Sequence, residues 1–353
     1  MHRNKMKKGL IGSLIMLLFI GVPLLVKGQA CPACSNPALQ SSEKLEAGLD
    51  TLEAGSFRLT MNVTSGSNYQ GGHPNSKGLN DNGVIITTPL HQHTVSLDFL
   101  RTEINVEYTF KTNWSLWLRV PYDIKKQEAS VDFTEQATEL EKQFILNNRD
   151  IHHRTETYAG LSDLRLLMSH RINGFLGKNG RLDMAFGASL PIGKTEENPL
   201  VAGDNGLKHL HIQFGSGTFD PLFELHYANS ITAKTSLALY TINKFPFYSN
   251  QLNYKSAVET TSGVSIGHRI SDWLSARGTL ASFSQGYAKW NGENDPNSGL
   301  VSFNGNIGLT FYAPDGLLLS PGYRFPISQS TLSKEGDTFE YGATFLLNVS
   351  YLF

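Results

Sequence analysis

Cysteine is nearly absent from this sequence: the 353 residues contain two, Cys31 and Cys34. So small a number excludes a disulfide framework as the source of stability. Beyond residue 30, no apolar run approaches the ~20 residues that a transmembrane helix needs, so a membrane protein of this sequence would have to be a barrel. The sequence also has no excess of basic residues, because it contains 30 Lys and Arg and 31 Asp and Glu. Nothing in this composition suggests a nucleic-acid partner.

The first thirty residues have the layout of a secretory signal peptide. A basic segment containing Arg3 and Lys5 precedes the apolar stretch 9–26, and the small residues Gly28 and Ala30 follow. We predict a signal peptide over residues 1–30, cleaved after Gly28 or Ala30. An uncleaved anchor helix and a lipidated Cys31 are the alternatives. Removing residues 1–28 leaves 25 basic and 31 acidic residues, a formal charge of −6.

The last sixteen residues alternate with period two, which is the period of a β-strand. One face carries Phe339, Tyr341, Ala343, Phe345, Leu347, Val349, Tyr351 and Phe353. The positions between them are mostly small or polar, so one face suits an apolar medium and the other a wetter one. A strand that ends on the final aromatic residue is typical of bacterial outer-membrane barrels. We expect the barrel assembly machinery to recognise this strand at Phe353.

Twelve candidate strands can be read along the chain. They lie near 56–65, 94–110, 113–126, 157–172, 181–193, 217–230, 234–246, 256–270, 273–290, 298–312, 316–328 and 338–353. In the second strand the apolar phase changes between Phe99 and Ile104, which suggests a bulge there. The pattern predicts an all-β protein whose residues 56–353 form one antiparallel transmembrane barrel of about twelve strands.

The connections between these strands alternate in length. Short turns follow the even-numbered strands, and longer polar segments follow the odd-numbered ones, at 66–93, 127–156, 194–216, 247–255, 291–297 and 329–337. Outer-membrane barrels have short periplasmic turns and long extracellular loops. A soluble β-sandwich gives no reason for long loops to gather at one end. We therefore predict a location in the bacterial outer membrane, in contact with its lipid.

Four short glycine-rich and proline-rich segments follow one another in a recognisable order. They are Gly160–Arg165, Leu190–Lys194, Gly215–Pro221 and Pro321–Ile327. With this set, residues 90–353 resemble the outer-membrane transporter family named after the meta-pathway of phenol degradation. The resemblance implies a barrel with a transport role and, by the family name alone, a phenolic solute. It provides no substrate-binding residue.

Cys31 and Cys34 form a Cys-Pro-Ala-Cys motif just beyond the expected cleavage site. Such a pair can form a disulfide, carry out redox chemistry or bind a soft metal ion. No His follows Cys34, which argues against haem attachment. The motif belongs to a periplasmic segment, 31–55, that is a candidate plug for the lumen.

Histidine recurs in the predicted outer loops. His91 and His93 lie two residues apart, and three loops on one side would also bring His73, the pair His152 and His153, and the pair His209 and His211 nearby. Imidazole binds copper, zinc and nickel. Solvated loop histidines are the plainer interpretation. We name Cys31, Cys34, His91 and His93 as candidate metal ligands, with copper or zinc as the ion. The two pairs are not expected to share one site, because the topology puts them on opposite sides of the ~25 Å apolar band.

Catalysis is not predicted. A hydrolase would need a serine, a histidine and an orienting group within reach of one another, and Ser169 and His170 point to opposite sides of one strand. The sequence therefore predicts a passive channel for a small solute, either an aromatic compound or a metal ion. A non-conducting structural or metal-binding barrel is the alternative, and a sealed lumen would favour it.

Overall fold

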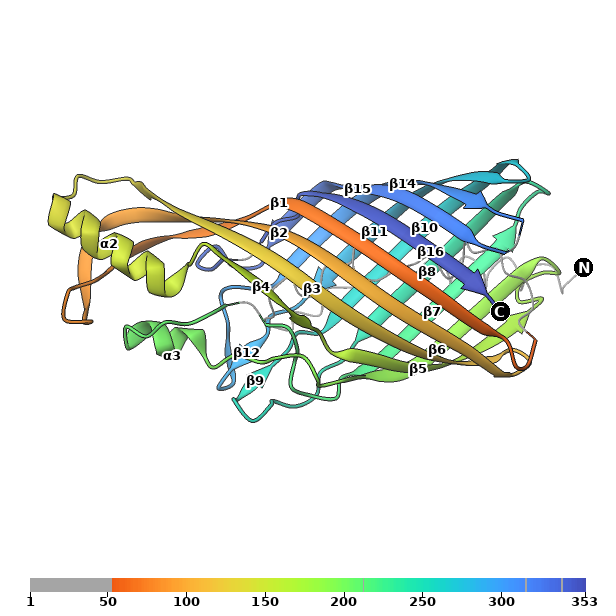
Figure 1. Ribbon diagram of the computed structural model, residues 1–353, viewed down its shortest axis with the longest axis horizontal. Coiled ribbons are helices and arrows are strands. Elements are labelled where there is room, and N and C mark those ends of the chain that lie inside the picture. Colours follow the sequence, from red (N-terminus) through yellow and green to blue (C-terminus); the bar gives the residue numbers. More distant parts are fainter. Residues whose placement is uncertain (1–52, 212, 315, 338) are drawn as a thin grey trace, which may run out of the picture.

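The alternating segments form the strands of one large sheet in the computed structural model, which describes residues 53–353 except 212, 315 and 338 (Figure 1). The signal peptide and the Cys31–Cys34 motif lie outside the described residues. The strands are β1 (Phe57–Leu79), β2 (Ile85–Lys111), β3 (Trp114–Phe133), β4 (Glu156–Leu161), β5 (Leu164–Asn173), β6 (Gly180–Leu190), β7 (Pro221–Ser230), β8 (Thr235–Lys244), β9 (Tyr254–Lys255), β10 (Glu259–Ser271), β11 (Leu274–Gln285), β12 (Lys289–Trp290), β13 (Glu293–Asn294), β14 (Leu300–Tyr312), β15 (Leu318–Thr331) and β16 (Ala343–Leu352). The helices are α2 (Glu139–His152) and α3 (Pro199–Asp204).

The sheet closes on itself as an antiparallel barrel. β1 pairs with β2 on one side and with β16 on the other, and β4 and β5 both pair with β3, so that together they act as one interrupted strand. The short strands β9, β12 and β13 form a separate small sheet. The closed barrel has twelve strands, which confirms the predicted fold class.

Alternate residues of each strand face outward, and most of these are large and apolar. Leu59, Leu100, Leu118, Ile266 and Phe345 are examples of exposed outward positions. An apolar exterior on a closed barrel has no role in water but matches the hydrocarbon layer of a membrane. Together with the fold, it places the protein in the bacterial outer membrane. No helix among the described residues is long and apolar enough to cross a membrane.

The predicted connections 66–93 and 127–156 are more regular than expected. β1 continues as far as Leu79, β2 already begins at Ile85, and β3 continues as far as Phe133. These three strands therefore extend past the rest of the barrel and carry α2 (Figure 1). The prediction of loops was wrong here because outward positions such as Gln70 and Ser96 are polar. These positions lie above the lipid, so the apolar alternation that reveals a membrane strand is missing. We call this end of the barrel the outer mouth.

The predicted bulge in the second strand is also displaced. β2 pairs with β3 without a register shift through this region, whereas Gly66 and Tyr69 of β1 pair with Phe99 and Leu97 of β2. The extra residue therefore belongs to β1, where Asn68 has a φ of 58°. The phase change on β2 is instead a change of face. From Val95 to Phe99 the apolar side chains point into the barrel, whereas from Leu100 to Ile104 they point outward.

The inner face of β2 shows how the lumen is layered. From the outer mouth inward its buried residues are two histidines, three apolar residues and then a polar series, namely His91, His93, Val95, Leu97, Phe99, Arg101, Glu103, Asn105, Glu107 and Thr109. Side chains from other strands continue each layer across the barrel.

The apolar layer closes the lumen below the histidines. Its buried members are Tyr69, Val95, Leu97, Phe99, Phe283, Leu300, Phe339 and Tyr341, with Tyr158 and Leu210 packed against them. β2 and β11, which supply Phe99 and Phe283, lie almost opposite each other in the strand order. The layer therefore spans the lumen rather than lining one wall. We call it the apolar plug.

Charged side chains fill the lumen below the plug. Arg119 bonds Glu224 through two contacts of 2.7 and 3.0 Å, and Arg101 bonds Asp123, which also accepts a hydrogen bond from Ser162. Facing the lumen avoids the roughly 2–4 kcal/mol that a basic residue costs at mid-depth on the lipid side. At the end with the short turns the barrel opens into a cavity of about 1150 Å³, which Arg181, Arg277 and other polar residues line.

Candidate metal centre at the outer mouth

Seven of the eleven histidines gather above the apolar plug. β1 supplies His73, β2 supplies His91 and His93, α2 and its C-cap supply His152 and His153, and the segment between α3 and β7 supplies His209 and His211. Asp337, from the segment before β16, joins them. Five separate parts of the chain thus meet in one cluster, which we call the histidine centre.

Strand register fixes the first members of the histidine centre. His73 and His93 are directly paired across β1 and β2, and both point into the lumen. His91 lies two residues from His93 on the same face, so its side chain points the same way. The Nε2 atoms of His91 and His93 are 3.1 Å apart.

Helix α2 places the next two. Thr138 caps its N-terminus in a reciprocal capping box with Glu141, which satisfies backbone donors at the start of the helix. Asn147 and Asn148 donate side-chain hydrogen bonds of 3.2 Å to the carbonyl oxygens of Leu79 and Lys77 on β1. These contacts hold the helix against the β1–β2 extension, so that its last residues reach over the lumen.

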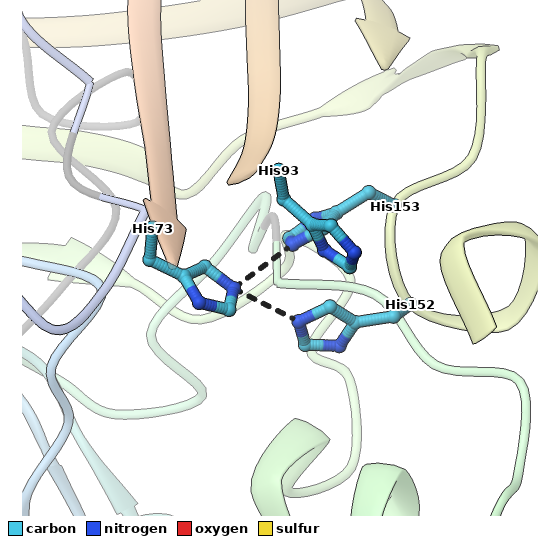
Figure 2. A group of neighbouring side chains, drawn as sticks. All are labelled: His73, His93, His152 and His153. Atoms are coloured by element: carbon cyan, nitrogen blue, oxygen red, sulfur yellow. Dashed lines mark hydrogen bonds between the residues drawn. The ribbon is translucent and has the colours of Figure 1, made fainter. Parts of the chain in front are cut away.

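The ring nitrogens converge at short distances. Figure 2 shows His73 directed toward both His152 and His153, and its Nε2 lies 3.4 Å from the Nε2 of each. On the other side of His152, its Nδ1 lies 2.6 Å from His209 Nε2 and 3.3 Å from His211 Nε2. His73, His93, His152 and His153 can each offer one nitrogen within 4.8 Å of the others.

Three of the rings have their second nitrogen occupied by a backbone carbonyl. The Nδ1 atoms of His73, His91 and His209 donate to the carbonyl oxygens of Pro74, Pro89 and Leu207 at 2.9, 2.9 and 2.7 Å. A neutral ring that donates from Nδ1 has a lone pair on Nε2. This is the second-sphere arrangement that orients histidines in metal sites. In all three, the lone pair points at another histidine.

Asp337 gives the centre a buried negative charge. Its Oδ2 lies 3.1 Å from His153 Nε2 and 3.7 Å from His73 Nε2, and its side chain is 3% exposed. His152, His153, His211 and Asp337 make a second group whose ligand atoms lie within 4.8 Å of one another. Asn297 supports this side, because it accepts a hydrogen bond from the Asp337 backbone N–H and lies 2.9 Å from His211 Nδ1.

Burial favours the neutral form of His93, His152 and His211. It lowers the pKa of His93 to about 2, with further lowering from His153 and His73, and it holds the pKa values of His152 and His211 well below 6.5. Burial alone would raise the pKa of Asp337, but the adjacent His153 and His73 hold it below its ordinary value. Neutral imidazoles beside a carboxylate are the ligand set that zinc and copper accept.

The structure describes two of the four predicted metal ligands. His93 lies within the centre, His91 lies at its edge, and Cys31 and Cys34 lie outside the described residues. Asp337 was missed, because a single acid in a polar connection carries no signal of its own. Ser169 donates no bond to His170: its hydroxyl accepts one from Trp117 Nε1, while His170 stacks on Trp114.

Comparison with known proteins supports the fold. No protein-family model matches the sequence, and no curated protein matches it. The resemblance to the meta-pathway family therefore stays a prediction. An outer membrane channel from Pseudomonas putida F1 superposes with a TM-score of 0.52 at 11% identity, over 86% of this chain and 97% of that one.

Two further solved structures resemble the chain less closely. A FadL homologue from Pseudomonas aeruginosa has a TM-score of 0.41 at 11% identity, over 93% of this chain and 99% of its own. The P. putida toluene transporter TodX has a TM-score of 0.41 at 9% identity, over 93% and 98%. At such identities, the first likeness concerns the fold alone, and the TM-scores of the other two are too low to add to it.

Proposed function

We propose that this protein is a passive outer-membrane channel that captures a divalent transition-metal ion, zinc or copper, at its outer mouth. The observation that carries the proposal is the convergence of ring nitrogens from separate segments above the lumen. Lone pairs that face one another repel, and a cation placed between them removes that repulsion. The buried Asp337 supplies part of the compensating charge.

The barrel supports a passive route for small cargo. Twelve strands enclose a narrower lumen than the 16–18 strands of water-filled porins, so a single ion or small molecule suits its size. The inner face is polar below the apolar plug, and the 1150 Å³ cavity opens at the opposite end. An ion released from the centre would have to cross the plug, which makes the plug the expected barrier.

Ion entry into proteoliposomes tests the proposal. Refolded mature protein is inserted into vesicles that contain a zinc-sensitive dye, and Zn²⁺ or Mg²⁺ is added outside. We expect protein-dependent Zn²⁺ entry at low micromolar concentration and none of Mg²⁺. Replacing His73→Gln together with His153→Gln should abolish the selectivity. The control His170→Gln, at a histidine that stacks on Trp114 away from the histidine centre, should preserve it. Equal entry of both ions into wild-type vesicles would contradict the proposal.

A phenolic solute is the second candidate, implied by the family resemblance. The observation in its favour is the apolar plug, where Tyr69 and Phe99 pack edge to face and Tyr341 lies next to Tyr69. Such a layer would let an aromatic molecule pass more readily than an ion. Single-channel conductance in a planar bilayer, recorded with phenol and with zinc or copper salts, separates the two. Blocking or stepwise changes caused by phenol alone would favour the aromatic solute.

The apolar plug also gives the non-conducting alternative a physical basis. The members of the plug are 0–5% exposed. A barrel that binds metal but never conducts in the bilayer experiment would be a metal-binding outer-membrane protein rather than a channel.

Cys31 and Cys34 remain a separate proposed site for Cu(I) or Zn(II). Thiol-dependent binding should be lost when both are replaced, Cys31→Ser with Cys34→Ser. Equal binding by the double variant would discard this site.

We further propose that the barrel assembly machinery recognises the final strand, so that Phe353→Ala lowers the amount of folded protein in the outer membrane.

A further inference from the structure

His152 occupies the middle of the histidine centre and faces both halves of it. Its Nε2 lies 3.4 Å from His73 Nε2, while its Nδ1 lies 3.3 Å from His211 Nε2 and 2.6 Å from His209 Nε2. The two candidate ligand groups share His152 and His153. His152 meets the first group at Nε2, through His73, and the second at Nδ1, through His211.

His152 cannot form hydrogen bonds with His73 and His209 at both of its ring nitrogens, because too few N–H protons are present on it and on these neighbours. A neutral imidazole carries one N–H, so one of its nitrogens is always a bare lone pair. On the Nδ1 side, His209 presents its own Nε2 lone pair because its Nδ1 donates to Leu207. On the Nε2 side, His73 in its neutral form presents a lone pair, because its Nδ1 donates to the Pro74 carbonyl. Whichever tautomer His152 adopts, one lone pair faces another.

The spacing of the nitrogens fits metal ions better than direct contact. Two nitrogens that each lie about 2.0–2.1 Å from one tetrahedral zinc ion are about 3.3 Å apart. The distances from His73 to His152 and to His153 are both 3.4 Å, and the distance from His211 to His152 is 3.3 Å. The 2.6 Å contact between His152 and His209 is too short for this and has the length of a hydrogen bond.

We infer that the histidine centre binds two transition-metal ions bridged by the ring of His152, an inference that rests on the proposed metal-binding function. The first ion takes the Nε2 atoms of His73, His152 and His153, with His93 beside them. The second takes His152 Nδ1, His211 Nε2 and the carboxylate of Asp337. Binding both ions breaks the short hydrogen bond between His152 Nδ1 and His209 Nε2 and releases the single N–H proton of His152 to solvent. The resulting imidazolate and Asp337 contribute two negative charges to the buried pair.

Metal stoichiometry tests the inference. The full mature chain carrying Cys31→Ser and Cys34→Ser, which removes the thiolates, is refolded, equilibrated with Zn²⁺, desalted and analysed by elemental analysis. We expect two zinc ions per chain, and one after Asp337→Asn with His211→Gln. The control His268→Gln should keep two. Heat-modifiable migration on gels verifies that each variant has folded.

Electron paramagnetic resonance with Cu²⁺ tests the bridge itself. Two Cu²⁺ ions joined by one imidazolate are magnetically coupled, so the signal of isolated Cu²⁺ should be largely lost at two equivalents. It should return in His152→Gln at whatever copper content that variant retains. No bound metal in the parent would overturn the proposed metal function as well. One ion per chain, or two ions with uncoupled signals, would overturn the bridged pair but leave the metal function standing.

Discussion

Individual charged residues in the lumen depend on their partners. Arg119 and Glu224 are 5% and 1% exposed, and both guanidinium Nη atoms contact the carboxylate. The same carboxylate has a second neighbour, His226, whose Nε2 lies 3.2 Å from it. A charge buried at this depth is costly unless it is paired, so the loss of one partner is more harmful than the loss of both.

We therefore expect Arg119→Met to lower the free energy of unfolding by about 3–5 kcal/mol, because it leaves Glu224 buried without its guanidinium. Urea unfolding in detergent micelles, followed by tryptophan fluorescence, measures this. Adding Glu224→Met should recover much of the loss. Arg269→Met, which removes an exposed arginine, is the control and should change little. A double variant no more stable than the single one would contradict the argument.

Among the secondary-structure elements, α2 positions part of the histidine centre. Its first turn is held by the capping box of Thr138 and Glu141, its middle by Asn148 against β1, and its last residue is His152. The buried Ile145 adds apolar contact on the same face. Fraying of the first turn would therefore loosen ligands that lie three turns away.

The expected effect of Thr138→Ala is a loss of about 1 kcal/mol of helix stability, since the cap oxygen no longer accepts from the Glu141 backbone N–H. Because helix order and ligand position are linked, zinc affinity should fall by up to about fivefold. Isothermal titration of Zn²⁺ into the refolded protein measures this. Thr138→Asn keeps a capping oxygen and should retain wild-type affinity. Identical affinity in all three proteins would show that the cap does not support the site.

At the scale of the whole molecule, the layers of the lumen follow one another along the barrel axis. The histidine centre lies at the outer mouth, the apolar plug below it, and the ion pairs and open cavity below that. Asp337 and the plug residues Phe339 and Tyr341 belong to the same short segment. The layer that binds and the layer that closes the lumen are thus connected through the chain.

Removing the plug should open the lumen. We expect Phe99→Ala with Phe283→Ala to raise single-channel conductance severalfold in planar bilayers, because these two side chains meet the plug from nearly opposite walls. Phe303→Ala, which removes an exposed outward-facing ring on β14, is the matched control and should conduct as the wild type does. Unchanged conductance in the double variant would place the barrier elsewhere.

The candidate site shows how far sequence patterns reach. His91 and His93 could be selected because two like residues at spacing two share one face of a strand. Their partners could be named only as histidines of neighbouring loops, since the strands that carry them beyond the membrane lack apolar alternation. Asp337 could not be selected at all, because its role depends on contacts with His153 and His73, which are 184 and 264 positions away in the sequence.

Local patterns in the sequence were enough to predict the barrel, its strand number and its outer-membrane location. Period-two alternation, the absence of long apolar runs and the alternation of short and long connections are local properties, and each has only a few structural solutions. Tertiary structure decided what fills the lumen. Inward-facing residues of a barrel meet partners from across the ring, so the pairing of Arg119 with Glu224, the closure by the apolar plug and the sharing of His152 between two ligand groups depend on closure and register.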